Sequence, residues 1–270
     1  MNSKSRYEET FAEGDLIVIE DRRGNRYLER LEAGKVLNNH LGKINLGELI
    51  GAESGHEYAS QSGKQYYVYR PTLSDYIYLM PRGAQIIYPK DIGHILMHLD
   101  LYHGATVLEA GVGSGAMSLG LLSHGAKVTG VELREDHLNL ARKNVLNFFG
   151  EDILGDTYRL VRGDVGEFES EVRFDRVVLD LPEPWDVLSN VRRLLRQDGV
   201  LCIYLTNVTQ IVHLNEALDL YRFHSRSYVE LLERPWYFKA QVARPEHRMV
   251  AHTGFLIYAR PGKEVEVGMG

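Results

Sequence analysis

The sequence of 270 residues has one cysteine and no apolar run long enough to cross a bilayer. A lone cysteine excludes a disulfide within the chain, and Cys202 lies in a strand-like run, so we expect it to be a small buried apolar residue. The lack of about 18 consecutive apolar residues argues against a membrane-spanning helix. Residues 1–15 are polar and lack the apolar core of a signal peptide, so we expect a cytoplasmic protein.

The sequence also lacks an excess of positive charge, since its formal net charge is −6. This argues against a protein that coats nucleic acid without specificity, although binding follows the local field and not the total charge. Within 222–248, six basic residues outnumber three acidic ones, and aromatic side chains lie between them. A local RNA-binding surface and an ordinary solvated face both fit this pattern.

Metal-ligand patterns and hydrolase motifs are missing as well. His94 and His98 are four positions apart and would share one face of a helix, but no His-Glu-x-x-His motif and no cysteine pair accompanies them. No Gly-x-Ser-x-Gly motif is present, and Ser114 is better explained as part of a glycine-rich cofactor loop. We therefore expect neither a metal site nor serine-based hydrolysis.

Two parts of the chain differ in texture, and we predict a domain boundary between 1–80 and 81–270. In the first part, short apolar runs alternate with glycine-rich turns. A strand, a turn and a second strand are predicted over 16–28, because Gly24 and Asn25 suit the positive φ of a tight turn. The first part is thus predicted to be a small β-rich domain.

In the second part, apolar strands alternate with helices. This alternation predicts an α/β fold with a Rossmann-like, doubly wound and mostly parallel sheet. Two later strands, near 229–232 and 253–258, have no convincing helix between them and are predicted to form an antiparallel pair at one sheet edge. The other expected strands are 106–110, 127–132, 158–162, 175–181 and 199–205. The expected helices are 89–101 and about 115–124, 135–149, 186–196 and 209–221.

The first of these strands runs into a glycine-rich turn, in which Gly111, Gly113 and Gly115 would allow a tight turn and a close approach to a ligand. With Ala116 in the last position, the spacing also fits the dinucleotide pattern Gly-x-Gly-x-x-Ala, so the glycines alone do not choose a cofactor. Glu109 precedes the first glycine, where a carboxylate suits an ammonium group better than a pyrophosphate. This position favours S-adenosylmethionine.

Acidic residues also end the next two strands. Glu132 closes the second strand, where a carboxylate can accept hydrogen bonds from both hydroxyls of a ribose. Asp164 follows the third strand, where it can accept the amino group of an adenine ring. The alternative is that these acids only cap helices.

The fourth strand ends in Asp180-Leu-Pro-Glu-Pro-Trp185. Two prolines would hold the following loop rigid, and Trp185 would supply a flat apolar wall. A rigid loop beside a cofactor can keep a reacting group in line. The alternative is that Asp180 caps a helix and that the prolines only make a turn.

Together, the glycine loop, Glu132, Asp164 and the Asp180 motif resemble a class I S-adenosylmethionine-dependent methyltransferase. The motif at Asp180 and the segment 82–91 are similar to the tRNA (adenine-58-N1)-methyltransferase family, and the resemblance covers nearly the whole chain. The family implies S-adenosylmethionine as cofactor, tRNA as partner and a homotetramer. It also implies a role in RNA binding or assembly for the N-terminal domain.

The resemblance assigns roles to individual residues. Asp180 is the expected catalytic carboxylate. The expected cofactor contacts are Gln85, Ile86, Glu109, Gly111, Gly113, Ser114, Gly115, Ala116, Met117, Glu132, His137, Asp164, Val165 and Asp180. The expected substrate contacts are Tyr88, Tyr204, Trp185, Arg244, His247 and Arg248.

This assignment agrees with the chemistry of the base. Adenine N1 carries a lone pair, so its methylation needs no general base, and the product cation is delocalised onto the exocyclic N6. A carboxylate that accepts a hydrogen bond from N6 would stabilise this charge, which is the role expected of Asp180. The target base must leave its stack to be reached, and an aromatic side chain can then stack on it.

Three rival functions remain open at this point. A methyltransferase with a protein or small-molecule substrate fits the negative net charge. A non-catalytic RNA-binding subunit of the same fold would be expected to have lost the glycines or Asp180, and both are present. A nicotinamide oxidoreductase fits the glycine spacing, but Glu109 is badly placed for it. Adenine 57 is a further target that the sequence does not distinguish from adenine 58.

Overall fold

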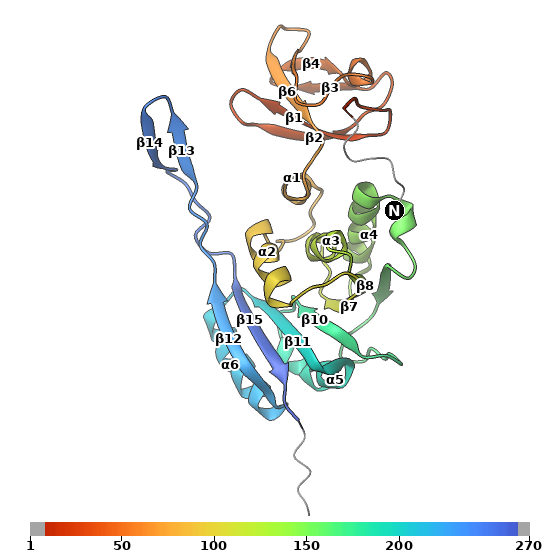
Figure 1. Cartoon of the computed structure of the whole chain (residues 1–270), viewed down its shortest axis with the longest axis vertical. Helices are drawn as coiled ribbons and strands as arrows, with labels where there is room; N and C mark the ends of the chain where they lie inside the picture. The colour runs from red at the N-terminus through yellow and green to blue at the C-terminus, as the bar shows by residue number, and fades with distance from the viewer. Residues whose placement is uncertain (1–8, 264–270) are drawn as a thin grey trace, which may run out of the picture. The chain divides into compact units, whose positions relative to one another are not determined.

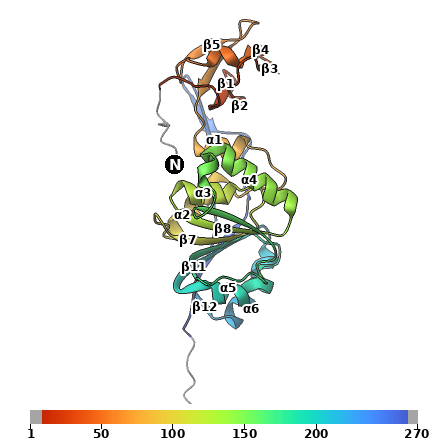
Figure 2. The same ribbon diagram turned by 90° about the vertical axis from the view of Figure 1, so that its right-hand side faces the viewer.

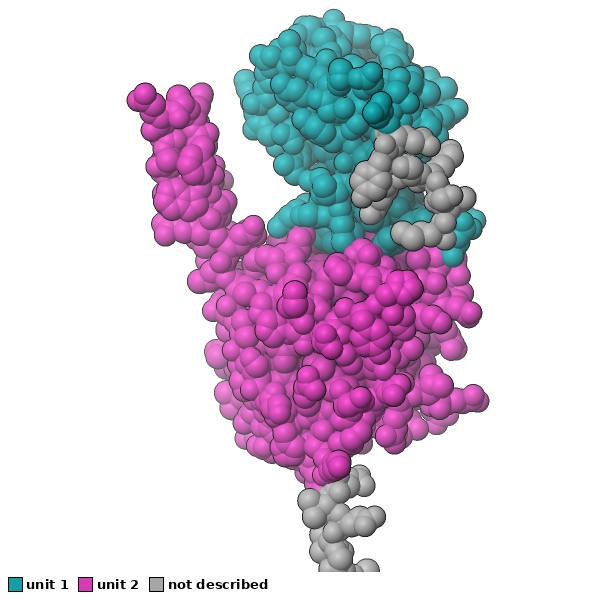
Figure 3. Space-filling model, viewed as in Figure 1, with its two compact units in different colours: residues 1–81, 146–152 teal, residues 82–145, 153–270 magenta. Residues whose placement is uncertain are grey.

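The computed structural model describes residues 9–263, and its contacts divide the chain into two compact units (Figure 3). The first unit takes the chain up to residue 81 together with 146–152, and the second takes 82–145 and the chain from 153 onward. The short segment 146–152 joins the first unit because, for example, the ring of Phe148 lies 4.8 Å from that of Tyr76. Sequence patterns held no sign of this contact.

The first unit is rich in β-structure, as predicted. Its strands are Leu16–Asp21 (β1), Arg26–Arg30 (β2), Val36–Asn39 (β3), Gly42–Asn45 (β4), Glu57–Ala59 (β5) and Gln65–Tyr69 (β6), and a 3₁₀ turn covers Leu46–Leu49. Four of them form an antiparallel sheet in the order β2-β1-β6-β5, and the hairpin β3–β4 packs apolar residues onto the same core. The predicted turn between β1 and β2 forms because the buried carboxylate of Asp21 accepts the backbone N–H groups of Arg23 and Asn25, each at 2.8 Å.

A helix that the sequence analysis did not predict, α1 (Leu73–Leu79), follows the last strand of this unit. Its signal was nevertheless present. Thr72 and Asp75 form a capping box, in which each side chain bonds the other's backbone N–H.

The second unit contains a seven-stranded sheet. Its strands are Thr106–Ala110 (β7), Lys127–Glu132 (β8), Tyr158–Arg162 (β9), Phe174–Leu179 (β10), Leu195–Leu205 (β11), Phe223–Glu230 (β12) and Phe255–Pro261 (β15), in the order β12-β15-β11-β10-β7-β8-β9. Neighbours from β11 to β9 are parallel, whereas β15 is antiparallel to both β11 and β12, which confirms the predicted fold. The edge strand β12 begins six residues earlier than the predicted 229.

Helices cover both faces of this sheet (Figure 2). They are Pro89–His98 (α2), Ala116–Ser123 (α3), Glu135–Phe149 (α4), Leu188–Leu194 (α5) and Val208–Leu220 (α6), with 3₁₀ turns at Glu151–Ile153 and Pro184–Val187. Helices α2, α3 and α4 lie on one face, and α5 and α6 lie on the other. Helix α3 is buried all round because nearly every residue in it is apolar or small. None of the described helices has the length and apolar character needed to cross a bilayer.

Strand order reverses at β7, since β8 and β9 lie on one side of it and β10 and β11 on the other. In open α/β sheets, ligands bind beyond the carboxyl ends of the strands at such a reversal. The residues just after β7 and β10, at 111 and 180, are therefore expected to meet at the site.

Between β12 and β15 the chain leaves the sheet as an extended excursion, residues 231–253, which we call the arm (Figure 1). It contains a hairpin of β13 (Trp236–Lys239) and β14 (Val242–Pro245). The hairpin was not predicted, because its two-residue turn has Ala240 at a φ of +50° where Asn-Gly would be the usual signal.

Candidate active site

The glycine loop after β7 is held against the end of β10. Gly111 has a φ of +80°, and a Cβ built there would lie 2.0 Å from the carbonyl oxygen of Asp180. The backbone N–H of Asp180 also donates to the carbonyl of Ala110 at 2.9 Å. Only glycine fits at 111, and this close approach brings the cofactor loop and Asp180 together.

The other two glycines of the loop have different tasks. A Cβ on Gly113, which has a φ of +57°, would meet nothing within 4 Å, so this residue leaves open space toward a ligand. Gly115 starts α3 with a φ of +84°, and a Cβ built there would lie 3.2 Å from the Cα of Ala141, so its missing side chain lets the loop pack against α4.

The carboxylate of Glu132 shapes the loop from the neighbouring strand. One of its oxygens accepts the backbone N–H of Gly113 and the other that of Arg134, each at 3.0 Å. Each oxygen keeps a second lone pair, so Glu132 can hold the loop and still accept from ribose hydroxyls.

Ser114 joins the loop to the segment that precedes α2, because its hydroxyl accepts the backbone N–H of Gly83 at 3.2 Å. This contact helps to close a narrow cavity around the loop. The cavity is lined by Gln85, Ile86, Ile87, Glu109, Gly111, Val112, Gly113, Ser114, Ala116, Met117 and Asp180.

Glu109 is buried in the wall of this cavity. One carboxyl oxygen accepts the hydroxyl of Ser118 at 2.5 Å, and Ser118 in turn accepts the hydroxyl of Tyr158 at 3.1 Å. The other oxygen, Oε1, has no hydrogen-bond partner among the described residues. Burial raises the pKa of Glu109 to about 8, so the group is mostly protonated at neutral pH unless a bound cation favours its ionised form.

Asp180 lies partly buried at the end of β10, where it lines the same cavity. Burial, together with the negative charge of Glu132, raises the pKa of Asp180 to about 7. A nearby positive charge would reverse this effect and favour the carboxylate.

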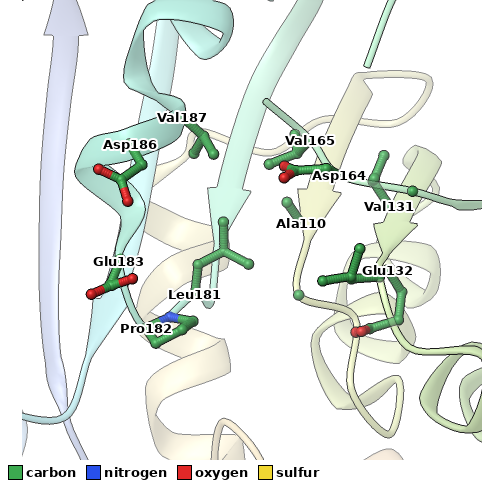
Figure 4. Close-up of a pocket in the computed structure, with 13 residues that line it drawn as sticks. Ala110, Val131, Glu132, Asp164, Val165, Leu181, Pro182, Glu183, Asp186 and Val187 are labelled. Atoms are coloured by element: carbon green, nitrogen blue, oxygen red, sulfur yellow. The ribbon is translucent and has the colours of Figure 1, made fainter. Parts of the chain in front are cut away.

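A second cavity of about 280 Å³ meets the first at Gly111 (Figure 4). Four carboxylates surround it, with those of Glu183 and Asp186 on one side and those of Asp164 and Glu132 on the other. Apolar side chains lie between them, as an adenine ring requires. The remaining lining residues are Ala110, Gly111, Val131, Leu133, Gly163, Val165, Leu181, Pro182 and Val187.

These two cavities fit S-adenosylmethionine and not a dinucleotide. The unpartnered oxygen of Glu109 matches an ammonium group, Glu132 matches a ribose, and the apolar walls beside Asp164 match an adenine. Six carboxyl groups and no basic side chain occur among the described residues that line the cavities, so a pyrophosphate would be repelled. Fold and site thus define a class I S-adenosylmethionine-dependent methyltransferase.

Curated relatives and family models match nearly the whole chain. A family model described as tRNA methyltransferase complex GCD14 subunit matches residues 64–242, and one described as TrmI-like N-terminal matches residues 10–56. A tRNA (adenine(58)-N(1))-methyltransferase TrmI of Thermus thermophilus is 35% identical over 92% of this chain and 97% of its own. A TrmI of Methanocaldococcus jannaschii, named for adenines 57 and 58, is 31% identical over 90% and 94%.

Solved structures agree with these matches. The tRNA (m1A58) methyltransferase TrmI of Aquifex aeolicus has a TM-score of 0.83 and 31% identity, covering 94% of this chain and 100% of that one. A protein from Thermotoga maritima titled a SAM-dependent O-methyltransferase has a TM-score of 0.89 and 31% identity, covering 96% and 97%. The chain belongs to the tRNA (adenine-58-N1)-methyltransferase family, and S-adenosylmethionine is its methyl donor.

Among the expected substrate contacts, Tyr88 lies next to the cofactor cavity. It precedes α2 as the N-cap residue, and the side-chain amide of Gln85 donates to its hydroxyl at 2.9 Å. His137, an expected cofactor contact, does not line either cavity. Its ring lies beside Gly83, and its buried Nε2 has no hydrogen-bond partner within the described part of the chain.

Two other expected contacts, Tyr204 and Trp185, do not line the cavities. Tyr204 is only 3% exposed, and its hydroxyl donates to the carbonyl of Thr253, so the ring offers no open face to a base in this structure. Trp185 packs against the core, with its ring 5.7 Å from that of His213. The rigid wall that the sequence assigned to Trp185 is instead formed by Leu181, Pro182 and Val187.

The remaining three lie on the arm and not at the cofactor cavities. Arg244 stacks over the ring of Tyr237 at 4.7 Å, and its neighbours His247 and Arg248 are exposed. Sequence reasoning missed Glu183 and Asp186 as lining residues. Glu183 lies within the motif already singled out at Asp180, and Asp186 directly follows that motif.

The Gly111→Ala variant should lose cofactor binding, because its methyl group would overlap the carbonyl of Asp180 and force the loop and β10 apart. Calorimetric titration with S-adenosylmethionine should show at least a roughly tenfold weaker Kd, on the order of the effect of a displacement of about 1 Å. Gly104→Ala is the matched control for lost glycine flexibility, since Gly104 also has a positive φ, nothing lies within 4 Å of its Cβ, and it lines neither cavity. Binding by Gly111→Ala equal to that of the wild type would contradict the packing argument.

Affinity for S-adenosylmethionine should rise as pH increases from about 6 toward 8. The raised pKa of about 8 leaves Glu109 largely neutral at the acidic end, whereas the cationic ligand binds its ionised form more tightly. Affinity should therefore level off at the pH where Glu109 is already ionised in the ligand-free protein. In Glu109→Gln the Kd should be about tenfold weaker at the alkaline end and depend less on pH. A Kd with the same pH dependence in both proteins would sink this role for Glu109.

Proposed function

We propose that this protein transfers a methyl group from S-adenosylmethionine to N1 of adenine 58 in the T-loop of tRNA. The observation that carries the proposal is the place of Asp180 in the wall of the cofactor cavity, where the close approach of Gly111 to its carbonyl fixes its backbone. The names of the relatives supply the target base. The name of the archaeal relative supports adenine 57 as a second target.

Asp180 stabilises the positive charge that develops on the base and does not act as a general base. S-adenosylmethionine supplies an electrophilic methyl group bound to a cationic sulfur. Adenine N1 attacks with its own lone pair, and positive charge spreads to N6. An ionised Asp180 that accepts a hydrogen bond from N6 stabilises this charge as it develops.

Several groups keep the acceptor aligned with the donor. Pro182 and Pro184 restrict the backbone on either side of Glu183, which lines the second cavity, where the adenine of the cofactor is expected to bind. At the first cavity, the side-chain amide of Gln85 orients the hydroxyl of Tyr88. The ring of Tyr88 can then stack on a base that has left its helix. Alignment of this kind supplies most of the catalysis when the donor is already reactive.

The arm and the first unit are proposed to hold tRNA. Arg234, Lys239, Arg244 and Arg248 place positive charge on the arm, and Trp236 and Phe238 expose flat apolar faces there. Such mixed basic and aromatic surfaces suit phosphates and unstacked bases. The same exposed apolar side chains are compatible with the homotetramer that the family implies. The homotetramer and a cytoplasmic location stay predictions.

Methyl transfer is tested with the purified protein, methyl-labelled S-adenosylmethionine and an unmodified tRNA transcript. Nuclease digestion and mass spectrometry should find the label in 1-methyladenosine, and a reverse-transcription stop should place it at position 58, with 57 resolved as a separate stop. Label in a ribose or another oxygen acceptor would favour the activity named for the Thermotoga maritima structure. The absence of label in RNA would refute the proposal.

Asp180→Asn should lower kcat about 100-fold while changing the Kd of S-adenosylmethionine only a few fold, because an amide can accept the N6 bond but does not match the charge. For the wild type, kcat/KM for S-adenosylmethionine should rise with pH between about 6 and 8, because the raised pKa values of Asp180 and Glu109 leave both groups partly protonated in the cofactor-free enzyme. A variant that keeps the wild-type kcat would contradict this mechanism.

The double variant Arg244→Ala/Arg248→Ala should raise the KM for tRNA several-fold, leave kcat unchanged and reduce the salt dependence of binding. Filter binding and steady-state kinetics at two salt concentrations measure these effects. Arg159→Ala is the matched control, since this exposed arginine lies on β9 at the opposite sheet edge. Equal KM values in all three proteins would remove the arm from the RNA-binding surface.

A further inference from the structure

Both ends of the arm meet at one side chain, the ammonium of Lys90 in the first turn of α2. Lys90 donates to the carbonyl of Leu231, where the arm leaves the sheet, at 2.8 Å. It also donates to the hydroxyl of Thr253, where the arm returns, at 2.7 Å. Twenty-one residues of the chain lie between these two contacts, and they include the whole hairpin.

The ammonium of Lys90 donates its third hydrogen bond to Oδ1 of Asp91 at 2.8 Å, so every donor of Lys90 has a partner. Asp91 is fully buried, and its other oxygen accepts the hydroxyl of Thr253 at 2.8 Å. The side chain of Lys90 is 12% exposed. A buried pair that is fully bonded in this way specifies geometry more than it adds stability.

The same few residues continue directly into the cofactor cavity. Gln85, Ile86 and Ile87 line that cavity, Tyr88 caps α2, and Lys90 follows two residues later. On the opposite side, the hydroxyl of Tyr204 holds the carbonyl of Thr253 from the end of β11. A Cβ on the next residue, Gly254, would lie 2.3 Å from the Tyr204 ring, so the returning chain passes directly over it.

We propose that Lys90, with Asp91 and Thr253, is a positioning group for the RNA substrate. It fixes both ends of the arm to the segment that lines the methyl-donor cavity. An RNA held by the arm is thereby set at a defined place relative to the donor. This inference rests on the proposed function, because it takes the arm to be an RNA-binding element.

The clamp formed by Lys90, Asp91 and Thr253 differs from the other tie at the base of the arm. His252 bonds the carboxylate of Glu230 at 2.6 Å and the carbonyl of Thr206 at 2.9 Å, but both side chains in this ion pair are exposed by more than a third. Exposed pairs are weak and are screened by salt. The buried contacts of Lys90 therefore carry the geometry.

The test compares the wild type with Lys90→Met/Asp91→Asn, which removes both charges together and leaves no unpaired carboxylate buried. Thr253→Val is a milder second variant that removes one hydroxyl from the same cluster and serves if the double variant does not fold. Lys127→Met is the matched control, an exposed lysine at the amino end of β8. Amide hydrogen exchange, the Kd of S-adenosylmethionine, the Kd of tRNA and kcat for tRNA methylation are measured for each.

We expect faster exchange over 231–253 in both clamp variants, with unchanged protection of β7, β8 and β10 and an unchanged Kd of S-adenosylmethionine. Because the arm keeps its own RNA contacts but loses its place, kcat should fall about tenfold or more while the Kd of tRNA changes less. This split is the reverse of that expected for Arg244→Ala/Arg248→Ala, so positioning and binding are separated.

Wild-type exchange and kinetics in both clamp variants would overturn the inference. Faster exchange of the arm with wild-type kcat would also overturn it, since the clamp would then matter only for the fold. A wild-type protein that binds S-adenosylmethionine but methylates no tRNA would refute the proposed function, and the inference would fall with it.

Discussion

The site depends on one steric constraint, the passage of Gly111 beneath the carbonyl of Asp180. No side chain fits between these two strand ends, because a Cβ at 111 would lie 2.0 Å from the oxygen. The two cavities meet at Gly111, and the carboxyl expected to act on the base belongs to Asp180. The order of the strands places both residues where the sheet reverses, so fold and chemistry share one contact.

Around that contact lie six carboxyl groups, and no basic side chain among the described residues that line the two cavities balances their charge. Glu109 keeps an unpartnered buried oxygen, and the pKa values of Glu109 and Asp180 are raised to about 8 and 7 by burial. Such a site is poised for a ligand that carries positive charge at both its amino group and its sulfur. Glu132 shows how one acid serves two purposes, since it shapes the glycine loop while it lines the second cavity.

The α/β fold and the acids at the strand ends could be predicted because each follows from a local pattern. Alternating apolar runs fix a parallel sheet, and the carboxyl ends of its strands must share one edge. The directions of Trp185 and Tyr204 could not be predicted, because packing against His213 and the bond to Thr253 depend on distant parts of the chain. The hairpin of the arm lacked the usual turn residues, and the Lys90 clamp joins residues 141 and 163 positions apart.

The most direct test counts the protons released when S-adenosylmethionine binds. Calorimetric titration near neutral pH, in two buffers of different ionisation enthalpy, gives this number without any assumption about the RNA. If a cationic ligand ionises the raised Glu109 and Asp180 carboxyls, release of about one proton is predicted. Binding with no proton release at this pH would contradict the electrostatic account of the site.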